Sequence, residues 1–283
     1  CGGGWHDAID TSPRFYVEQN RQSILGGAPE VLLFNYGSLQ GGRKHARGPE
    51  GVEALMAELP AHFDLARLIH GKKPRGLLGW KPANSTPGPD FHLHPLLGMA
   101  GLPVTAAADF DAGGAGFVFG CHTVHDPAWW DALEAALDSG KPVVCTEDFP
   151  RFISARAEGN RMDLEALREG AVTLPRLEEK RRWPTLEQMP TDELNALRDR
   201  CMEGMGRFHA PHGVALYLFD EGLVVVENFR DAPVACTLRL QGAASFERAL
   251  AIPEGPGFEV GSGAEARLAL PARSLLALKT VVR

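Results

Sequence analysis

The fold of this chain is decided by four short apolar runs: GLLGW (76–80), PVTA (103–106), GFVFG (116–120) and PVVCT (142–146). Runs of this length between Gly and Pro are typical of strands that are covered on both faces. Residues 91–99 and 127–139 lie between these runs and show helical spacing. Alternating strands and helices predict a parallel sheet with right-handed crossovers, so we expect a doubly wound α/β domain.

Composition sets the protein class. The chain has 283 residues, of which 44% are hydrophobic and 23% charged, with a net charge of -7. This length predicts two or three domains. The acidic balance without a basic face argues against a nucleic-acid partner. No apolar run reaches the ~18 residues that a membrane helix needs, so we expect no membrane span.

The cysteines indicate a reducing compartment. There are five, they are scattered, and none forms a CxxC pair. This pattern predicts free thiols without structural zinc and favours the cytoplasm. The first residues, CGGGWHDAID, contain neither Met nor the features of a signal peptide. We therefore expect that the chain belongs to a longer protein, and an export signal upstream stays possible.

The remaining segments predict helices first and strands last. Pro13 is expected to start a helix over 14–25, Glu30–Tyr36 (EVLLFNY) reads as a buried strand, and residues 49–69 predict an amphipathic helix with a kink at Pro60. Residues 148–182 predict short helical pieces, including Leu174–Leu177. A helix is expected over Thr191–Met205, with Leu194, Leu197 and Cys201 on its apolar face. Short alternating strands then predict a β-sandwich: Val214–Phe219, Leu223–Asn228, Val234–Leu240, Glu265–Leu270 and Ser274–Val281.

The order of these parts resembles the C-terminal half of β-galactosidases of glycoside hydrolase family forty-two. Three segments carry the resemblance: FYVEQNRQSILGGAPEVLLFNYGS (15–38), residues 74–146, and GVALYLFDEGLVVVENFRDAPV (213–234). The resemblance implies the end of a TIM barrel (1–48), a linking helix (49–73), a flavodoxin-like, class I glutamine amidotransferase-like domain (74–210) and a C-terminal β-sandwich (211–283). It also implies a carbohydrate substrate for the whole protein and a homotrimer formed through the amidotransferase-like domain, with no cofactor.

Glycosidases of this kind use two carboxylates at barrel strands four and seven. If residues 30–36 form strand eight, both carboxylates lie upstream, and no residue of this chain takes a catalytic role. The resemblance then implies that residues of this chain contribute only to the rim of the sugar-binding pocket. The candidates are Trp5, His6, Asp7, Asp10, Asn35, Tyr36 and Ser38, which lie in the expected loop after strand seven or at the carboxyl end of strand eight. The aromatic and arginine pairing expected around the last barrel strand is not evident, so the substrate sugar stays open.

A different hypothesis is a cysteine-dependent, amidotransferase-like hydrolase that uses Cys121. This residue follows the run 116–120, where the nucleophile elbow of such enzymes lies. The elbow pattern is G-x-C-x-G, and here no Gly follows the cysteine. The next helix is expected to start late, near Asp126 or Pro127, and neither His209 nor His212 is followed by an acid at short spacing. A buried thiol at the end of a strand is therefore the competing interpretation.

Two further hypotheses remain from the sequence. His92, His94, His122 and His125 have spacings seen in metal sites, but no carboxylate or Cys completes a local set, so we predict no metal. The chain could instead be a pure interaction module. Exposed aromatics such as Trp129 and Trp130 would then belong to a subunit interface. In the trimer that the resemblance implies, the Pro-rich loop 81–89 is the candidate contact surface.

Overall fold

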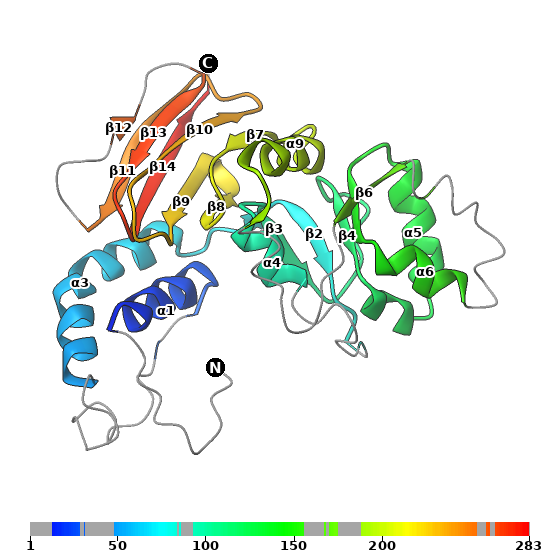
Figure 1. Cartoon of the computed structure of the whole chain (residues 1–283), viewed down its shortest axis with the longest axis horizontal. Helices are drawn as coiled ribbons and strands as arrows, with labels where there is room; N and C mark the ends of the chain where they lie inside the picture. The colour runs from blue at the N-terminus through cyan, green and yellow to red at the C-terminus, as the bar shows by residue number, and fades with distance from the viewer. Residues whose placement is uncertain are drawn as a thin grey trace. The chain divides into compact units, whose positions relative to one another are not determined.

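The computed structural model divides into two compact units, each described by itself (Figure 1). One comprises Cys1–Lys72 and Leu250–Gly255, and the other comprises Lys73–Ala249 and Pro256–Arg283. None of the described helices has the length and the apolar character needed to cross a membrane. The structure describes residues 13–28, 31, 48–83, 85, 93–155, 167, 170–174, 188–253, 259–260 and 264–282.

The first unit contains two packed helices, α1 (Pro13–Leu25) and α3 (Gly48–Ile69), as predicted from the sequence. Pro60 lies inside α3, which is bent in Figure 1. A buried polar cluster joins the helices: Arg21 donates to Glu58, and Asn20 donates to Nδ1 of His62 over 2.6 Å. Burial raises the pKa of the Glu58 carboxyl, but hydrogen bonds and positive charge from His62 and Arg21 outweigh it and lower the pKa. The strand expected over 30–36 lies outside the described residues.

A parallel sheet is the core of the α/β part, with strand order β3-β2-β4-β5-β6. The four strands predicted from the apolar runs are confirmed. A fifth, β6 (Ala171–Leu174), falls where short helical pieces were expected. At Leu174 the expected helical piece was wrong, because the apolar residues 171–174 pair with β5 as a buried strand. The helix α6 (Asp148–Ser154) confirms one of the short helical pieces expected over 148–182. The strands of this sheet are β2 (Leu77–Trp80), β3 (Val104–Ala107), β4 (Phe117–Phe119), β5 (Val143–Thr146) and β6.

Helices cover this sheet, and a cluster of buried aromatic side chains lies between them and the strands. The helices are α4 (Leu93–Met99), α5 (Trp129–Asp138) and α6 (Asp148–Ser154). Trp129 and Trp130 are 6% and 7% exposed and belong to the same core cluster as Phe117 and Phe119. The hypothesis that this tryptophan pair forms an exposed contact surface is therefore wrong, because both indoles pack inward.

Two antiparallel sheets accompany the parallel one, so the chain is of mixed α/β class. The first has the order β1-β8-β9-β14-β11 and the second β12-β13-β10-β7. Four of the five predicted strands keep their predicted bounds, namely β8 (Val214–Phe219), β9 (Leu223–Asn228), β10 (Val234–Leu240) and β14 (Ser274–Val281), and β13 runs over Ala266–Leu270. The sequence reading missed β1 (Pro74–Arg75), β7 (Gly206–His209), β11 (Ser245–Ile252) and β12 (Glu259–Val260). These strands are very short or, like β11, carry adjacent charged residues that interrupt the alternation.

Two elements link the parallel and antiparallel sheets within the second unit. The strand β1 pairs with β8, and after Gly76 the chain enters β2 of the parallel sheet. The helix α9 (Thr191–Cys201) packs against β7 and ends earlier than predicted, because Met202–Met205 turn directly into that strand.

We predict that Gly76→Ala lowers the free energy of unfolding by about 2 kcal/mol or more. Gly76 has a φ of 147°, and a Cβ there would clash with the carbonyl of Pro103, which accepts a hydrogen bond from Leu77. The matched control is Gly98→Ala in α4, where a Cβ meets nothing within 4 Å. That change should stabilise the helix by up to about 1 kcal/mol. Urea denaturation of both variants tests this, and equal effects would contradict the close approach at Gly76.

Candidate functional site

The residues expected at the pocket rim are not tested by the structure. Trp5, His6, Asp7 and Asp10 precede the described part of the chain, and Asn35, Tyr36 and Ser38 also lie outside it. Their role therefore stays a prediction. Most of the loop 81–89 also falls outside the described residues.

Cys121 lies at the carboxyl edge of the parallel sheet, directly after β4. It begins a short 3₁₀ helix, Cys121–His125, that the sequence did not reveal, and α5 starts only at Trp129. The side chain is 1% exposed and belongs to the hydrophobic core of the sheet. This environment suits a structural thiol better than a nucleophile that must reach a substrate.

Two of the nearby histidines, His122 and His94, make contacts within the protein. His122 donates from Nε2 to the carbonyl oxygen of Trp80 over 3.0 Å, and its ring meets that of His94 edge to face with centroids 5.7 Å apart. Among the described residues, which leave out His92, no group of three or more His, Cys, Asp and Glu side chains could hold a metal ion. The bond to Trp80 instead fixes the 3₁₀ helix to β2.

A cleft of about 500 Å³ lies where α9 meets strands β7, β10 and β13. The sequence reading did not identify it, because its lining comes from distant segments. Small and apolar residues form much of the surface, with a few polar side chains among them. The lining residues are Thr191, Asn195, His209, Ala210, Pro211, Ala235, Cys236, Thr237, Arg267, Leu268 and Ala269.

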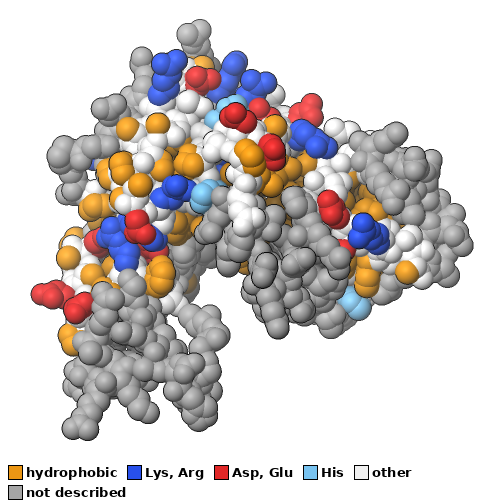
Figure 2. Space-filling model, in the orientation of Figure 1, with side chains coloured by type: hydrophobic (Ala, Val, Ile, Leu, Met, Phe, Trp, Pro, Cys, Tyr) orange, Lys and Arg blue, Asp and Glu red, His pale blue; other side chains and the backbone are white. Residues whose placement is uncertain are grey.

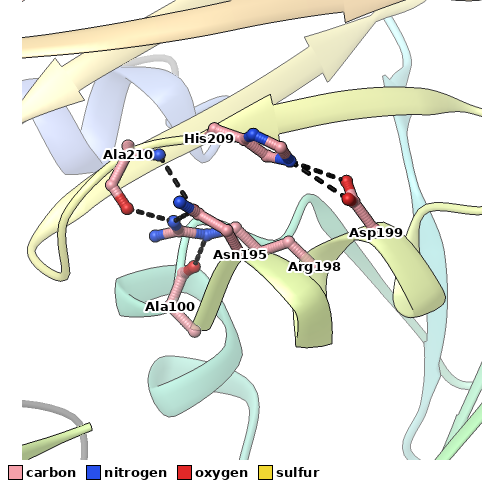
Figure 3. A network of polar contacts seen from close by, with 6 residues as sticks. All are labelled: Ala100, Asn195, Arg198, Asp199, His209 and Ala210. Carbon is pink, nitrogen blue, oxygen red and sulfur yellow. Dashed lines mark hydrogen bonds and ion pairs between the residues drawn. The ribbon is translucent and has the colours of Figure 1, made fainter. Parts of the chain in front are cut away.

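The buried guanidinium of Arg198 organises the α9 side of this cleft (Figure 3). It is 0% exposed and donates through Nε to Ala100 O (2.6 Å), through Nη1 to Asn195 Oδ1 (2.6 Å) and Ala210 O, and through Nη2 to Pro211 O (3.3 Å). Asn195 Oδ1 also accepts from the backbone N–H of Ala210 over 3.1 Å. Arg198 thereby sets the positions of Asn195 and Ala210, which both line the cleft.

His209 and Asp199 form a second polar pair beside Arg198 (Figure 3). The Nε2–H of His209 donates to the two carboxylate oxygens of Asp199, at 2.9 and 3.1 Å. The side chains are 39% and 32% exposed, so water screens the pair. The sequence has no acid at short spacing after His209, and the acid that pairs with it lies ten residues earlier, on α9. This pairing fixes the imidazole ring in the cleft wall.

Burial shifts the pKa of Cys236 at the cleft and of the neighbouring Arg198. Burial raises the pKa of Cys236 to about 12, although the positive charge of Arg198 lowers it in part. Burial also lowers the pKa of Arg198 to about 10, partly offset by Cys236. At neutral pH Arg198 therefore keeps its charge and Cys236 keeps its proton.

Part of this chain matches a protein-family model, and its fold is similar to that of two solved structures. Residues 1–59 match the family model described as "Probable glycosyl hydrolase, catalytic domain". Alpha-L-fucosidase isoenzyme 2 from Paenibacillus thiaminolyticus is 11% identical with a TM-score of 0.58, over 96% of this chain and 58% of that chain. Gan42B, a GH42 beta-galactosidase, is 10% identical with a TM-score of 0.51, over 96% and 51%. A search of curated proteins finds no match.

These findings support a glycosyl hydrolase-like protein. The family match covers only the first part of the chain, and at such low identities the two structures show similarity of fold alone. The chain spans little more than half the length of either solved structure.

We predict that Cys121 is protected from iodoacetamide in the native chain at pH 8. Because its side chain lies in the core, alkylation should be more than about tenfold slower than in the urea-unfolded chain. Peptide mass spectrometry measures the modification of each cysteine, and Cys201 provides a control, since burial raises its pKa to about 12. Labelling of native Cys121 at or above the unfolded rate would support the nucleophile hypothesis instead.

Proposed function

We propose that this chain is the C-terminal, largely non-catalytic portion of a glycoside hydrolase-like, carbohydrate-active protein, in which the parallel-sheet domain serves assembly. The observation that carries the proposal is the match of residues 1–59 to a glycosyl hydrolase catalytic domain. The fold likeness to two longer glycosidase structures over 96% of the chain supports it.

The first unit has features expected of the edge of a larger barrel. On α3, Met56 is 58% exposed and Phe63 is 56% exposed. Seven residues separate them, so both side chains lie on one face of the helix. Phe15 on α1 is 53% exposed. Large exposed apolar side chains on neighbouring helices are consistent with packing against further barrel elements.

The proposed non-catalytic role follows from the chemistry of glycoside hydrolysis. That reaction uses two carboxyl groups about 5–10 Å apart, flanking the scissile bond. The lining of the cleft beside α9 contains no Asp or Glu. Under this proposal the carboxylate pair belongs to the earlier barrel strands, and Trp5, His6, Asp7, Asn35 and Tyr36 contribute at most to the rim of the sugar pocket.

The assembly role is proposed for the domain 74–210. Counted along the chain, the five strands of its parallel sheet, β2 to β6, have the order 2-1-3-4-5, which is the flavodoxin-like order. In the resembled family an amidotransferase-like domain of this fold makes the trimer contact, so we propose a homotrimer, with residues 211–283 as a C-terminal β-sandwich. The deep burial of Cys121 favours this role over an amidotransferase-like hydrolase.

We predict that the purified 283-residue chain assembles but does not hydrolyse aryl glycosides. Sedimentation velocity at micromolar concentration should give a species of three times the monomer mass. Hydrolysis of a panel of nitrophenyl glycosides by the same preparation should stay at the level of a buffer blank.

A monomer at these concentrations would refute the assembly role. Saturable turnover that is lost on replacing Asp7 or Asp10 by Asn would refute the non-catalytic role. The matched control is replacement of exposed Asp138 at the end of α5, which should change neither measurement.

A further inference from the structure

The outer face of the four-stranded sheet carries three arginines, and Glu259 of β12 is directly opposite Ala269 on the same face. In β10, burial alternates, with Cys236 and Leu238 inside and Ala235 and Arg239 outside. Arg239 is directly opposite Arg207 of β7. Two like charges in this arrangement destabilise a strand pair. Neither arginine forms an ion pair with a residue that the structure describes.

Arg267 adds a third cation on the same face. Thr237 of β10 is directly opposite His209 on one side and opposite Arg267 of β13 on the other. Directly opposite residues point to the same face of a sheet. Arg267 is exposed, lines the cleft and forms no ion pair with a described residue. In Figure 2 several Lys and Arg side chains gather with Asp and Glu at the top of the view, in the region of β7 and β10.

The cleft beside this face offers hydrogen-bond donors at fixed positions. The Oδ1 atom of Asn195 is occupied by Arg198 and by the N–H of Ala210, which leaves the Nδ2 group to donate. Thr237 supplies a hydroxyl next to Arg267. Asp199, the nearby carboxylate, is engaged by the ring of His209 and is not part of the lining. The polar groups of the cleft therefore favour an acceptor-rich, negatively charged ligand.

The rest of the cleft suits an apolar surface. Ala235 and Ala269 are directly opposite each other on the outer face, and both small side chains line the cleft. Ala210 and Pro211 form the adjoining wall. A volume of about 500 Å³ lies within the usual range for small-molecule sites.

We propose that this cleft binds a small carboxylic acid of one or two rings. The guanidinium of Arg267 receives the carboxylate in a bidentate contact, the geometry for which arginine is suited. Thr237 and the Nδ2 group of Asn195 donate to the remaining oxygen lone pairs, and the ring lies on Ala235 and Ala269. A uronic acid and an aromatic acid share this chemistry, and the proposal does not depend on the glycosidase assignment.

The test is calorimetric titration of the full chain with glucuronate, benzoate and neutral glucose. We expect saturable 1:1 binding of at least one acid and none of glucose. Glucuronate alone would assign an acidic sugar, whereas benzoate would assign a carboxylate without the need for sugar hydroxyls. Failure of both acids to bind, or binding of glucose as tight as that of an acid, would overturn the proposal.

Two arginine variants then locate the site. Arg267→Gln should raise the dissociation constant about tenfold or more, the effect of losing a charge-assisted bond, and Arg267→Lys should recover part of it. Arg200→Gln is the matched control, because Arg200 is exposed on α9 but does not line the cleft. It should change the dissociation constant less than about twofold, since its charge is screened by water. An unchanged affinity in Arg267→Gln, or an equal loss in both Gln variants, would reject this cleft as the site.

Discussion

The arrangement of the second unit depends on one buried cation, the guanidinium of Arg198. No carboxylate contacts it among the described residues, so its desolvation is offset by hydrogen bonds to carbonyl oxygens and by the face of Phe208, whose centroid lies 5.4 Å away. The acceptors come from the end of α4 and from the segment between β7 and β8. A buried guanidinium is tolerated only when its N–H groups have hydrogen-bond acceptors. The segments that supply these acceptors must therefore lie next to Arg198 on α9. Gly101 permits the approach, since a Cβ there would lie 3.1 Å from Nη2 of Arg198 and 2.8 Å from Val214 O.

The same contacts connect the parallel sheet to the cleft. Ala100 follows α4, which covers the parallel sheet, whereas Ala210 follows β7 of the antiparallel sheet. Asn195 is oriented by Arg198 and in turn holds the backbone of Ala210. The hydrogen bonds of Arg198 therefore position Asn195, which we propose as a donor to the carboxylate of the ligand. The positive charge that binds this carboxylate comes from Arg267 on β13.

The sequence predicted those parts whose pattern is continuous along the chain. Runs such as GFVFG and VALYLF identify strands because every residue, or every second one, is apolar. The predicted buried face of α9 was Leu194, Leu197 and Cys201. In the structure Leu194, Arg198 and Cys201 are buried. A hydropathy pattern places every arginine in solvent because the side chain is charged. The carbonyl oxygens that allow Arg198 to be buried come from distant segments, so no local pattern could reveal them. The cleft was missed for the same reason, and the expected rim residues lie outside the described parts of the chain.

The central claim is that Arg198 holds these segments together, and the urea unfolding free energy of Arg198→Leu tests it most directly. The variant removes the charge but leaves the carbonyls of Ala100 and Ala210 buried without their donor, at a cost of about 1–3 kcal/mol each. With Arg200→Leu on the exposed side of α9 as the control, we expect a loss of about 3 kcal/mol or more for Arg198→Leu and a change within about 0.5 kcal/mol for Arg200→Leu. Equal stability of the two variants, or a gain for Arg198→Leu, would contradict the account.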